Sequence, residues 1–80
     1  MKMETAIENG IKLTKYTYYY TNGKIKSEIY YKNGNFYRTS GPAIIYYYED
    51  GEVHSEEYYI DGVKITDELQ IMVMKGLQNV

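Results

Sequence analysis

Hydrophobic and polar residues alternate along most of the chain with a period of two, from residue 11 to residue 65. The alternating segments are rich in Tyr, Ile, Val and Thr, which favour β-strands because their side chains pack well on a pleated surface. They predict strands at residues 11–20, 24–31, 35–39, 43–48 and 52–60, with a short strand at 63–65. Pro42 lacks an N–H donor, so it fits a loop or the start of a strand.

Five Asn-Gly or Asp-Gly pairs separate the alternating segments. They are Asn9-Gly10, Asn22-Gly23, Asn33-Gly34, Asp50-Gly51 and Asp61-Gly62. A type I′ turn needs a positive φ at both central residues, and Asn, Asp and Gly adopt this conformation at low cost. The pairs therefore predict five tight hairpin turns of this type, and an antiparallel β-meander of five to six strands.

The spacing of the turns indicates a duplicated unit of 28 residues. Residues 18–34 and 46–62 are identical at nine of seventeen aligned positions. A repeat at a fixed period is typical of architectures in which each unit stacks on its neighbour. We therefore expect a single domain with a partial repeat and first strand at 1–17, repeat one at 18–45 and repeat two at 46–65.

Strict alternation assigns the side chains of each repeat to two faces of the sheet. In the first repeat, one face is expected to carry Ile25, Ser27, Ile29 and Tyr31, and the other Lys26, Glu28 and Tyr30. Both faces would then carry tyrosine and could pack or bind.

The pattern changes after residue 65, where a third copy would begin. Thr66 is a suitable helix N-cap, and Asp67 and Glu68 suit the positive end of a helix dipole. Hydrophobic residues then recur at helical spacing, at Leu69, Met72, Val73 and Leu77. We expect a capping helix within residues 66–78, laid over a face or edge of the sheet and stopped near Lys75-Gly76. The apolar run 71–74 leaves a further strand as the alternative.

Composition narrows the possibilities further. The 80 residues include twelve Tyr, one Phe, no Trp and no Cys, so disulfides and cysteine-containing zinc sites are excluded. No apolar run approaches the ~18 residues of a membrane span, and the N-terminus lacks the apolar stretch of a signal peptide, so we expect a cytoplasmic protein. A core this small supplies only ~3–5 kcal/mol, which favours help from a partner chain.

Residues suited to catalysis are few. His54 is the sole histidine, and its neighbour Ser55 is expected on the opposite face, which excludes a Ser-His pair. The acidic residues around Gly51 lack the spacing of a calcium loop, and no phosphate-binding loop occurs. We expect no enzyme activity, catalytic residue, cofactor or metal.

Charge is unevenly distributed along the chain. Residues 1–38 hold seven basic and three acidic side chains, whereas residues 39–80 hold two basic and eight acidic ones. Opposed charges of this kind steer encounters with a charged partner or with a second copy, so a homodimer is one expectation. An uneven but merely solvated surface is the alternative.

Tyrosine offers a large contact area with a hydrogen-bonding tip, and it is enriched in protein interfaces. We therefore predict a protein partner. The candidate contact residues are Tyr16, Tyr18, Lys24, Lys26, Tyr30, Tyr37, Arg38, Tyr46, Tyr48 and Tyr58.

An alternative uses the basic half of the chain, where five cations lie among aromatic residues: Lys15, Lys24, Lys26, Lys32 and Arg38. Single-stranded nucleic acid would stack its bases on the rings and bind its phosphates to the cations. An acidic pI of about 5.3 and a single arginine make nucleic acid the less favoured partner.

Tandem units of the form YY-x-x-G, S-E-x-Y-Y and N-G resemble MORN-type repeats. The segment around Arg38, Gly41, Pro42 and Ala43 is also similar to the His-Arg-Glu-Asp-Gly-Pro-Ala repeat of tailed-phage and giant-virus proteins, although Tyr37, Thr39 and Ser40 depart from it. The resemblance implies a β-meander interaction module, and by analogy a small viral accessory protein that binds and inhibits a host protein or defence complex. The resemblance to MORN-type repeats also implies, as an alternative, that anionic lipid head groups bind the same cluster of cations. Because Tyr37 replaces the His of that repeat, the neighbourhood of Tyr37 and Arg38 is the first candidate for an added site.

Overall fold

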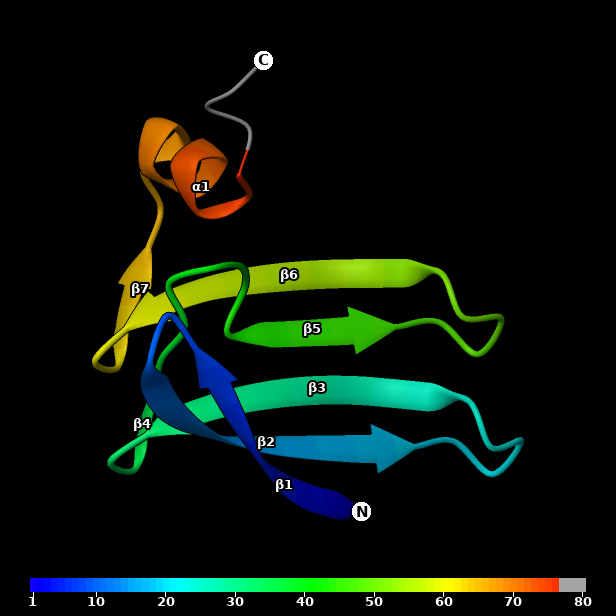
Figure 1. The fold of residues 1–80 in the computed structure, drawn as a ribbon. Helices are drawn as coiled ribbons and strands as arrows, with labels where there is room; N and C mark the ends of the chain where they lie inside the picture. Colours follow the sequence, from blue (N-terminus) through cyan, green and yellow to red (C-terminus); the bar gives the residue numbers. More distant parts are fainter. Residues whose placement is uncertain (77–80) are drawn as a thin grey trace.

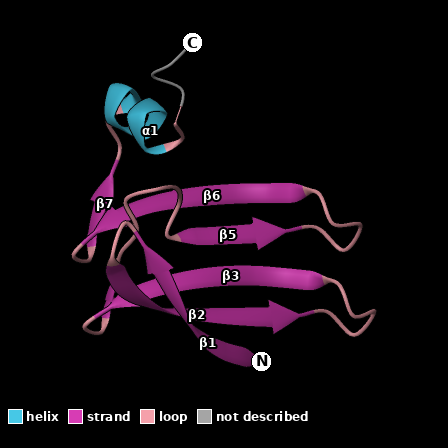
Figure 2. Ribbon diagram, viewed as in Figure 1, coloured by secondary structure: helices cyan, strands magenta, loops and turns pink. Residues whose placement is uncertain are grey.

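A computed structural model of the chain describes residues 1–76 and contains one antiparallel sheet followed by one short helix (Figures 1 and 2). The elements are β1 (Lys2–Glu8), β2 (Ile11–Tyr19), β3 (Ile25–Lys32), β4 (Asn35–Phe36), β5 (Ile44–Tyr47), β6 (Val53–Ile60), β7 (Val63–Ile65) and α1 (Glu68–Met74). The strand order is β1-β2-β3-β5-β6-β7, with β4 paired to β3. The predicted fold class, mainly β with a C-terminal helix, is confirmed.

The sheet has seven strands, against the five to six predicted, because β1 was not expected. Its sequence contains Lys, Glu and Ala, which are depleted in strands. Pairing with β2 stabilises this strand in spite of its composition. The pairing extends from Lys2 opposite Thr17 to Glu8 opposite Ile11. The Asn9-Gly10 hairpin signal was the clue that a strand precedes it.

The duplication has a direct structural counterpart, because β3 lies between two neighbours that pair with it in the same register. Glu28 of β3 lies opposite Thr17 of β2 on one side and Ile45 of β5 on the other. Ser27 likewise lies between Tyr18 and Tyr46. The two neighbours are the same strand of successive repeats, offset by 28 residues.

Each repeat also carries an irregularity at the same place. The register of β2 and β3 shifts between Tyr18 and Tyr19, which leaves Lys26 as an extra residue on β3. The register of β5 and β6 shifts between Tyr46 and Tyr47, which leaves His54 as the extra residue. Such bulges re-aim side chains locally, so strict alternation fails at these positions.

Only three of the five predicted turns have the type I′ conformation. Asn9, Asn33 and Asp61 have positive φ values together with the glycines that follow them, whereas at the other two turns only Gly23 and Gly51 do. There the N–H of the glycine bonds to the carbonyl of Tyr20 or Tyr48, which makes a three-residue loop ending in a left-handed glycine. The side chains of Asn22 and Asp50 accept from the N–H of Lys24 and Glu52, which stabilises this wider loop.

The core lies on one face of the sheet, here called the inner face. Leu13, Tyr30 and Tyr37 are buried there, and Ala6, Ile11 and Ile60 pack against them. The predicted strand at 35–39 ends at Phe36, because the chain then leaves β4 to bring Tyr37 into this core. Residues 37–43 connect β4 to β5 without further strand structure, as expected around Pro42.

Helix α1 is confirmed, and the alternative of a strand at 71–74 is wrong, but two details differ from the prediction. The N-cap is Asp67 and not Thr66, because the Asp67 carboxylate accepts from the N–H groups of Leu69 and Gln70. The predicted apolar stripe is exposed, with Leu69 74%, Met72 49% and Val73 60% accessible, while Met74 is buried. The end of the predicted helix, including Leu77, lies outside the described residues.

Leu13 should contribute much of the stability of this small core. We expect Leu13→Ala to lower the free energy of unfolding by ~2–4 kcal/mol, because it removes buried methyl groups and leaves a cavity. Ile7→Ala, at a position that is 67% exposed, should change it by less than ~0.5 kcal/mol. Urea unfolding followed by circular dichroism measures both, and equal losses for the two variants would contradict the assigned core.

Candidate functional site

The face of the sheet opposite the core, here called the outer face, collects aromatic side chains from several strands. Residues directly opposite one another on paired strands share a face, so the pairing registers group the rings together. We define the tyrosine face by its members: Tyr16, Tyr18, Tyr31, Phe36, Tyr46 and Tyr59. Both repeats contribute to it.

Four of these rings form a continuous row across the sheet. The ring of Tyr31 packs edge-on against the ring of Tyr16, with centroids 5.4 Å apart. On its other side it packs in a tilted arrangement against the ring of Phe36, with centroids 5.1 Å apart. Phe36 in turn packs against Tyr59 at 5.0 Å. Such contacts stabilise the sheet and also hold the rings in place, so little side-chain entropy is left to lose when a partner binds.

Small side chains between the rings make the surface of the tyrosine face uneven. Ser27 is only 6% exposed because it lies between Tyr18 and Tyr46, each of which is 39% exposed. A depression of about 280 Å³ is lined by Thr14, Tyr16, Tyr18, Tyr31 and Gly34. The face is therefore ridged, with exposed rings beside shallow hollows.

The surroundings of Tyr31 and Tyr59 raise the pKa of these two phenols. Burial raises the pKa of Tyr31, and the neighbouring hydroxyls of Tyr18, Tyr16 and Tyr46 raise it further. A hydrogen bond of 3.0 Å to Glu57 is the main cause that raises the pKa of Tyr59. These two hydroxyls are therefore neutral donors at physiological pH.

The outer face ends in a second depression next to the bulges, of about 390 Å³. It is lined by Tyr20, Lys26, Tyr46, Tyr47, His54 and Ser55. The expectation that His54 and Ser55 cannot meet is wrong, because His54 Nδ1 lies 3.1 Å from Ser55 Oγ. His54 is the extra residue of the bulge, so its side chain does not follow the alternation of the strand.

This contact lacks the third group of a catalytic arrangement. A Ser-His pair needs a partner that orients the imidazole. His54 is exposed and packs edge-on against the ring of Tyr48 at 4.7 Å, and within residues 1–76 no carboxylate is hydrogen-bonded to it.

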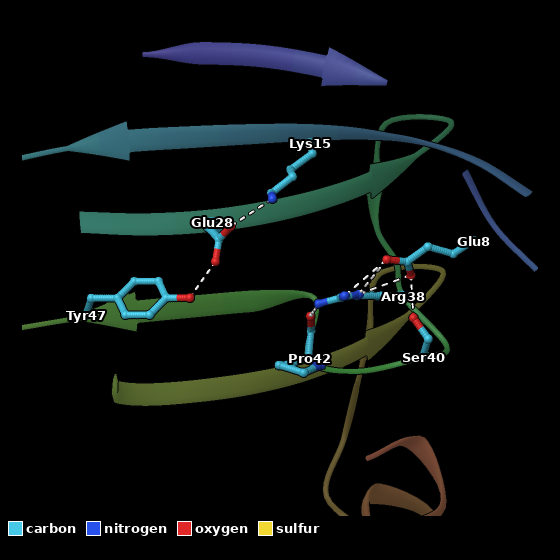
Figure 3. A network of polar contacts seen from close by, with 7 residues as sticks. All are labelled: Glu8, Lys15, Glu28, Arg38, Ser40, Pro42 and Tyr47. Carbon is cyan, nitrogen blue, oxygen red and sulfur yellow. Dashed lines mark hydrogen bonds and ion pairs between the residues drawn. The ribbon is translucent and has the colours of Figure 1, made fainter. Parts of the chain in front are cut away.

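A separate polar network lies on the inner side of the sheet (Figure 3). Glu28 forms an ion pair with Lys15 at 2.8 Å and accepts a hydrogen bond of 2.5 Å from the hydroxyl of Tyr47. Glu8 accepts from Arg38 Nε at 3.1 Å and from Ser40 at 2.5 Å, and lies 3.0 Å from Arg38 Nη2. These carboxylates are structural, because their partners are side chains of the fold.

Arg38 is the centre of this network and explains the Arg-x-x-Gly-Pro sequence around it. Its guanidinium carbon lies 4.0 Å from the centroid of the Tyr30 ring, and its Nη1 donates to the carbonyl of Pro42 at 3.2 Å. A Cβ at Gly41 would lie 3.3 Å from Arg38 Nη1, so glycine leaves room for the guanidinium. The hypothesis of an added site at Tyr37 and Arg38 is therefore wrong, since Tyr37 is 8% exposed and Arg38 is engaged by the fold.

The predicted contact residues divide into three groups. Tyr16, Tyr18 and Tyr46 come together on the tyrosine face, with Lys26 and Tyr48 near its bulge end. Tyr30, Tyr37 and Tyr58 are buried at 5%, 8% and 4% exposure, so we correct their assignment from partner contact to core. Lys24 and Arg38 bond within the protein, Lys24 Nζ donating to the carbonyl of Asp50 at 3.2 Å. Sequence reasoning missed Tyr31, Phe36 and Tyr59, whose grouping depends on register.

Cations and exposed rings are largely separated in the structure. Lys15 pairs with Glu28, Lys32 lies 4.8 Å from the centroid of the buried Tyr37 ring, and Arg38 pairs with Glu8. Lys26 alone of the five predicted cations lines a depression with a ring of the tyrosine face. In the described part of the chain, no group of three His, Cys, Asp or Glu is placed to hold a metal ion.

Comparison with known families identifies the repeats. The profile of the MORN repeat variant matches residues 12–33 and 44–61, which together make up half of the chain. The chain belongs to the MORN repeat variant family. Each match covers one strand pair, β2 with β3 and β5 with β6, and so agrees with the 28-residue duplication.

No curated protein and no solved structure matches this MORN repeat chain. Within residues 1–76, its one helix is too short to cross a membrane.

Acid should destabilise the fold through Glu8 and Glu28. Burial by itself would raise the pKa of each carboxyl, but hydrogen bonds from Arg38 and Ser40, or from Lys15 and Tyr47, outweigh burial and lower the pKa below the ordinary 4.5. The folded state then binds fewer protons than the unfolded state, so this stabilisation is complete above about pH 4.5 and is lost as the pH falls below it.

The free energy of unfolding, measured in urea between pH 7 and pH 3, should therefore decrease with acidification. Glu28→Gln should reduce the pH-dependent part of this decrease, because it removes one of the two carboxyls. Glu4→Gln, at an exposed position, is the matched control. If the free energy of unfolding falls by the same amount between pH 7 and pH 3 in Glu28→Gln as in the wild type, Glu28 is not one of the carboxyls that cause the decrease.

Proposed function

We propose that this chain is a non-enzymatic protein-binding module and that the tyrosine face is its contact surface. The observation that carries the proposal is the ordered row of partly exposed aromatic rings across both repeats. Binding interfaces are enriched in aromatic residues at their centres, where a few rings dominate the affinity.

Two properties of the tyrosine face support a protein partner. The hydroxyls of Tyr16, Tyr18, Tyr31 and Tyr46 form no side-chain hydrogen bond with any other residue in the part of the chain that the structure describes, so their donors face solvent. Between the rings, the central strands contribute Ser, Thr and Ile to this face. Its charged side chains are Lys12 of β2 and the ion pair of Glu57 with Lys64 at 4.0 Å. A surface dominated by hydroxyls and apolar groups suits backbone carbonyls and apolar side chains.

Nucleic acid is the second candidate, and Lys26 is the observation that favours it. Its ammonium lies 5.9 Å from the centroid of the Tyr20 ring, in the depression shared with Tyr46 and His54. Bases stacked on these rings would need further cations for the phosphates. The internal partners of Lys15, Lys24 and Arg38 weigh against this candidate.

The finer proposal concerns the kind of partner. By resemblance of the segment from Arg38 to Ala43 to viral repeat proteins, we propose an accessory protein that acts in the host cytoplasm by binding and inhibiting a host protein or defence complex. The support for this step is the sequence similarity of that segment, which is an analogy of fold and motif.

Substitution of the exposed tyrosines tests the contact surface. We expect Tyr18→Ala and Tyr46→Ala each to weaken partner binding by ~10-fold or more, which is the effect of losing an interface hot spot. Tyr19→Ala is the matched control, because Tyr19 is 45% exposed but follows Tyr18 on the strand and points to the inner side. Quantitative affinity capture from host lysate identifies partners, and titration calorimetry with the purified partner gives the affinities.

Salt distinguishes the two candidates. A tyrosine-centred protein interface should depend little on ionic strength, whereas nucleic-acid binding should weaken steeply with salt and with Lys24→Ala and Lys26→Ala. Binding that withstands both tyrosine substitutions but falls with Tyr19→Ala would overturn the assignment of the tyrosine face.

A further inference from the structure

Strand β6 has one edge without a neighbouring strand over half of its length. It pairs with β5 on one side, from Glu57 opposite Ile44 to Val53 opposite Tyr47. On its other side β7 pairs only with Tyr58, Tyr59 and Ile60. Within the described chain, residues 53–57 therefore have no strand partner on this side. Figure 1 shows α1 on the same side of β6, above the half of the strand that leads to β7, and Lys75 after the helix lies 3.8 Å from the Glu56 carboxylate.

The internal repeat specifies what is missing at this edge. β6 is the copy of β3, and β3 pairs on the equivalent side with β5. A shift of 28 residues from Ile44–Tyr46 places the missing strand at residues 72–74, but these residues belong to α1. The residues that would form the next strand of the repeat are therefore helical, and the helix does not pair with β6 as a strand would.

Glu56 directs its backbone groups toward the open edge. The N–H of Ala43 donates to the carbonyl of Glu57 at 2.9 Å, so the backbone groups of Glu57 face β5. Adjacent residues of a strand direct their N–H and C=O groups to opposite sides. The N–H and C=O of Glu56 are therefore available to an added strand.

The side chain of Glu56 also lacks the partners of its counterpart in the first repeat. Glu28 has Lys15 at 2.8 Å from the strand on one side and the Tyr47 hydroxyl at 2.5 Å from the strand on the other. Ala43 stands in repeat two where Lys15 stands in repeat one, and the sequence counterpart of Tyr47 is Lys75, which follows α1 and not a strand. Within residues 1–76, the partners of the Glu56 carboxylate are the more distant Lys75 at 3.8 Å and the Tyr58 hydroxyl at 3.5 Å.

Charge around the edge favours a basic occupant. Glu56 and Glu57 lie on the open strand, and Glu49, Asp50 and Glu52 lie in the hairpin loop at its beginning. Two such edges placed side by side would bring these carboxylates together, and like charges directly opposite one another destabilise a strand pair. A second copy docked through the same edge is therefore disfavoured.

We propose that the open edge at residues 53–57 binds an extended basic segment of a protein partner as an added antiparallel strand. Main-chain hydrogen bonds give such strand addition its affinity, and alternate side chains give its specificity. A Lys or Arg of the segment lies directly across from Glu56 on the open side, and a Tyr two residues further along takes the position relative to Glu56 that Tyr47 has relative to Glu28. This inference rests on the proposed function only in that the partner is a protein, because it uses the strand edge and not the tyrosine face.

The chain itself supplies the probe, because β2 pairs with β3 in the same register as β5 does. A synthetic peptide with the sequence of residues 16–21 and the change Thr17→Lys, capped at both ends, carries a Lys opposite Glu56 and Tyr19 at the position of Tyr47, and it ends before the residues of β6 that pair with β7. Titrated into the full chain and followed by NMR, it should shift the amide signals of residues 53–57. The same peptide with N-methyl groups at alternate residues, so that those amides cannot donate, should not bind.

Charge variants test the role of Glu56. The peptide with Thr17→Glu should bind at least ~10-fold more weakly than the peptide with Thr17→Lys, as expected when a charge pair becomes a repulsion. Glu56→Gln in the full chain should reduce affinity for the original peptide, whereas Glu52→Gln, in the hairpin loop, is the matched control and should reduce it less. Circular dichroism of the two variants reports whether each is folded.

Several outcomes would overturn the proposal. These are equal binding of the N-methylated peptide, shifts confined to Tyr16, Tyr18 and Tyr31, no shift at millimolar peptide, and concentration-dependent self-association that shifts residues 53–57 without peptide. The proposed function fails separately, when Tyr18→Ala and Tyr46→Ala leave partner binding unchanged. The two tests are independent, because the peptide can bind the edge of β6 whether or not the tyrosine substitutions weaken partner binding.

Discussion

The guanidinium of Arg38 joins three parts of the chain that are distant in sequence. It pairs with Glu8 beside the first hairpin turn, lies over the ring of Tyr30 in β3, and donates to the carbonyl of Pro42 before β5. A planar group with several donors can bind a carboxylate and cover an aromatic ring at once, which lysine cannot do. The N-terminal hairpin, the core and the segment between the repeats are fixed to one another at this point.

Around that junction, the duplication determines the environment of many tyrosines. Tyr30 and Tyr58 are equivalent and both are buried, and Tyr18 and Tyr46 are equivalent and both are 39% exposed. Tyr19 and Tyr47 differ, since Tyr19 is 45% exposed whereas Tyr47 lies against Glu28. The abundance of tyrosine thus reflects one motif copied twice, and only the rings left on the outer face bear on recognition.

The two ends of the repeat array differ in how the edge of the sheet is covered. At the first end, β1 pairs along β2 and so covers the edge of the first repeat. At the second end, the sequence changes from strand to helix, and within residues 1–76 part of β6 has no strand paired to its outer edge. Open edges invite strand addition, and proteins often protect them with charged residues. Glu56 provides such protection against a like-charged edge, and in the proposed strand addition it selects a basic segment.

The sequence by itself determined the class of fold, the repeat, most strands and the presence of the helix, because alternation and turn residues act over short distances. It also identified Tyr16, Tyr18 and Tyr46 as contact candidates. Only the tertiary structure decided that Tyr30, Tyr37 and Tyr58 are core, that Arg38 is structural, and that Tyr31, Phe36 and Tyr59 continue the row of rings. The same applies to β1, and to His54 and Ser55, which meet because of a bulge. These features depend on register and on which face of a strand is covered, and both arise from contacts between residues far apart in the chain.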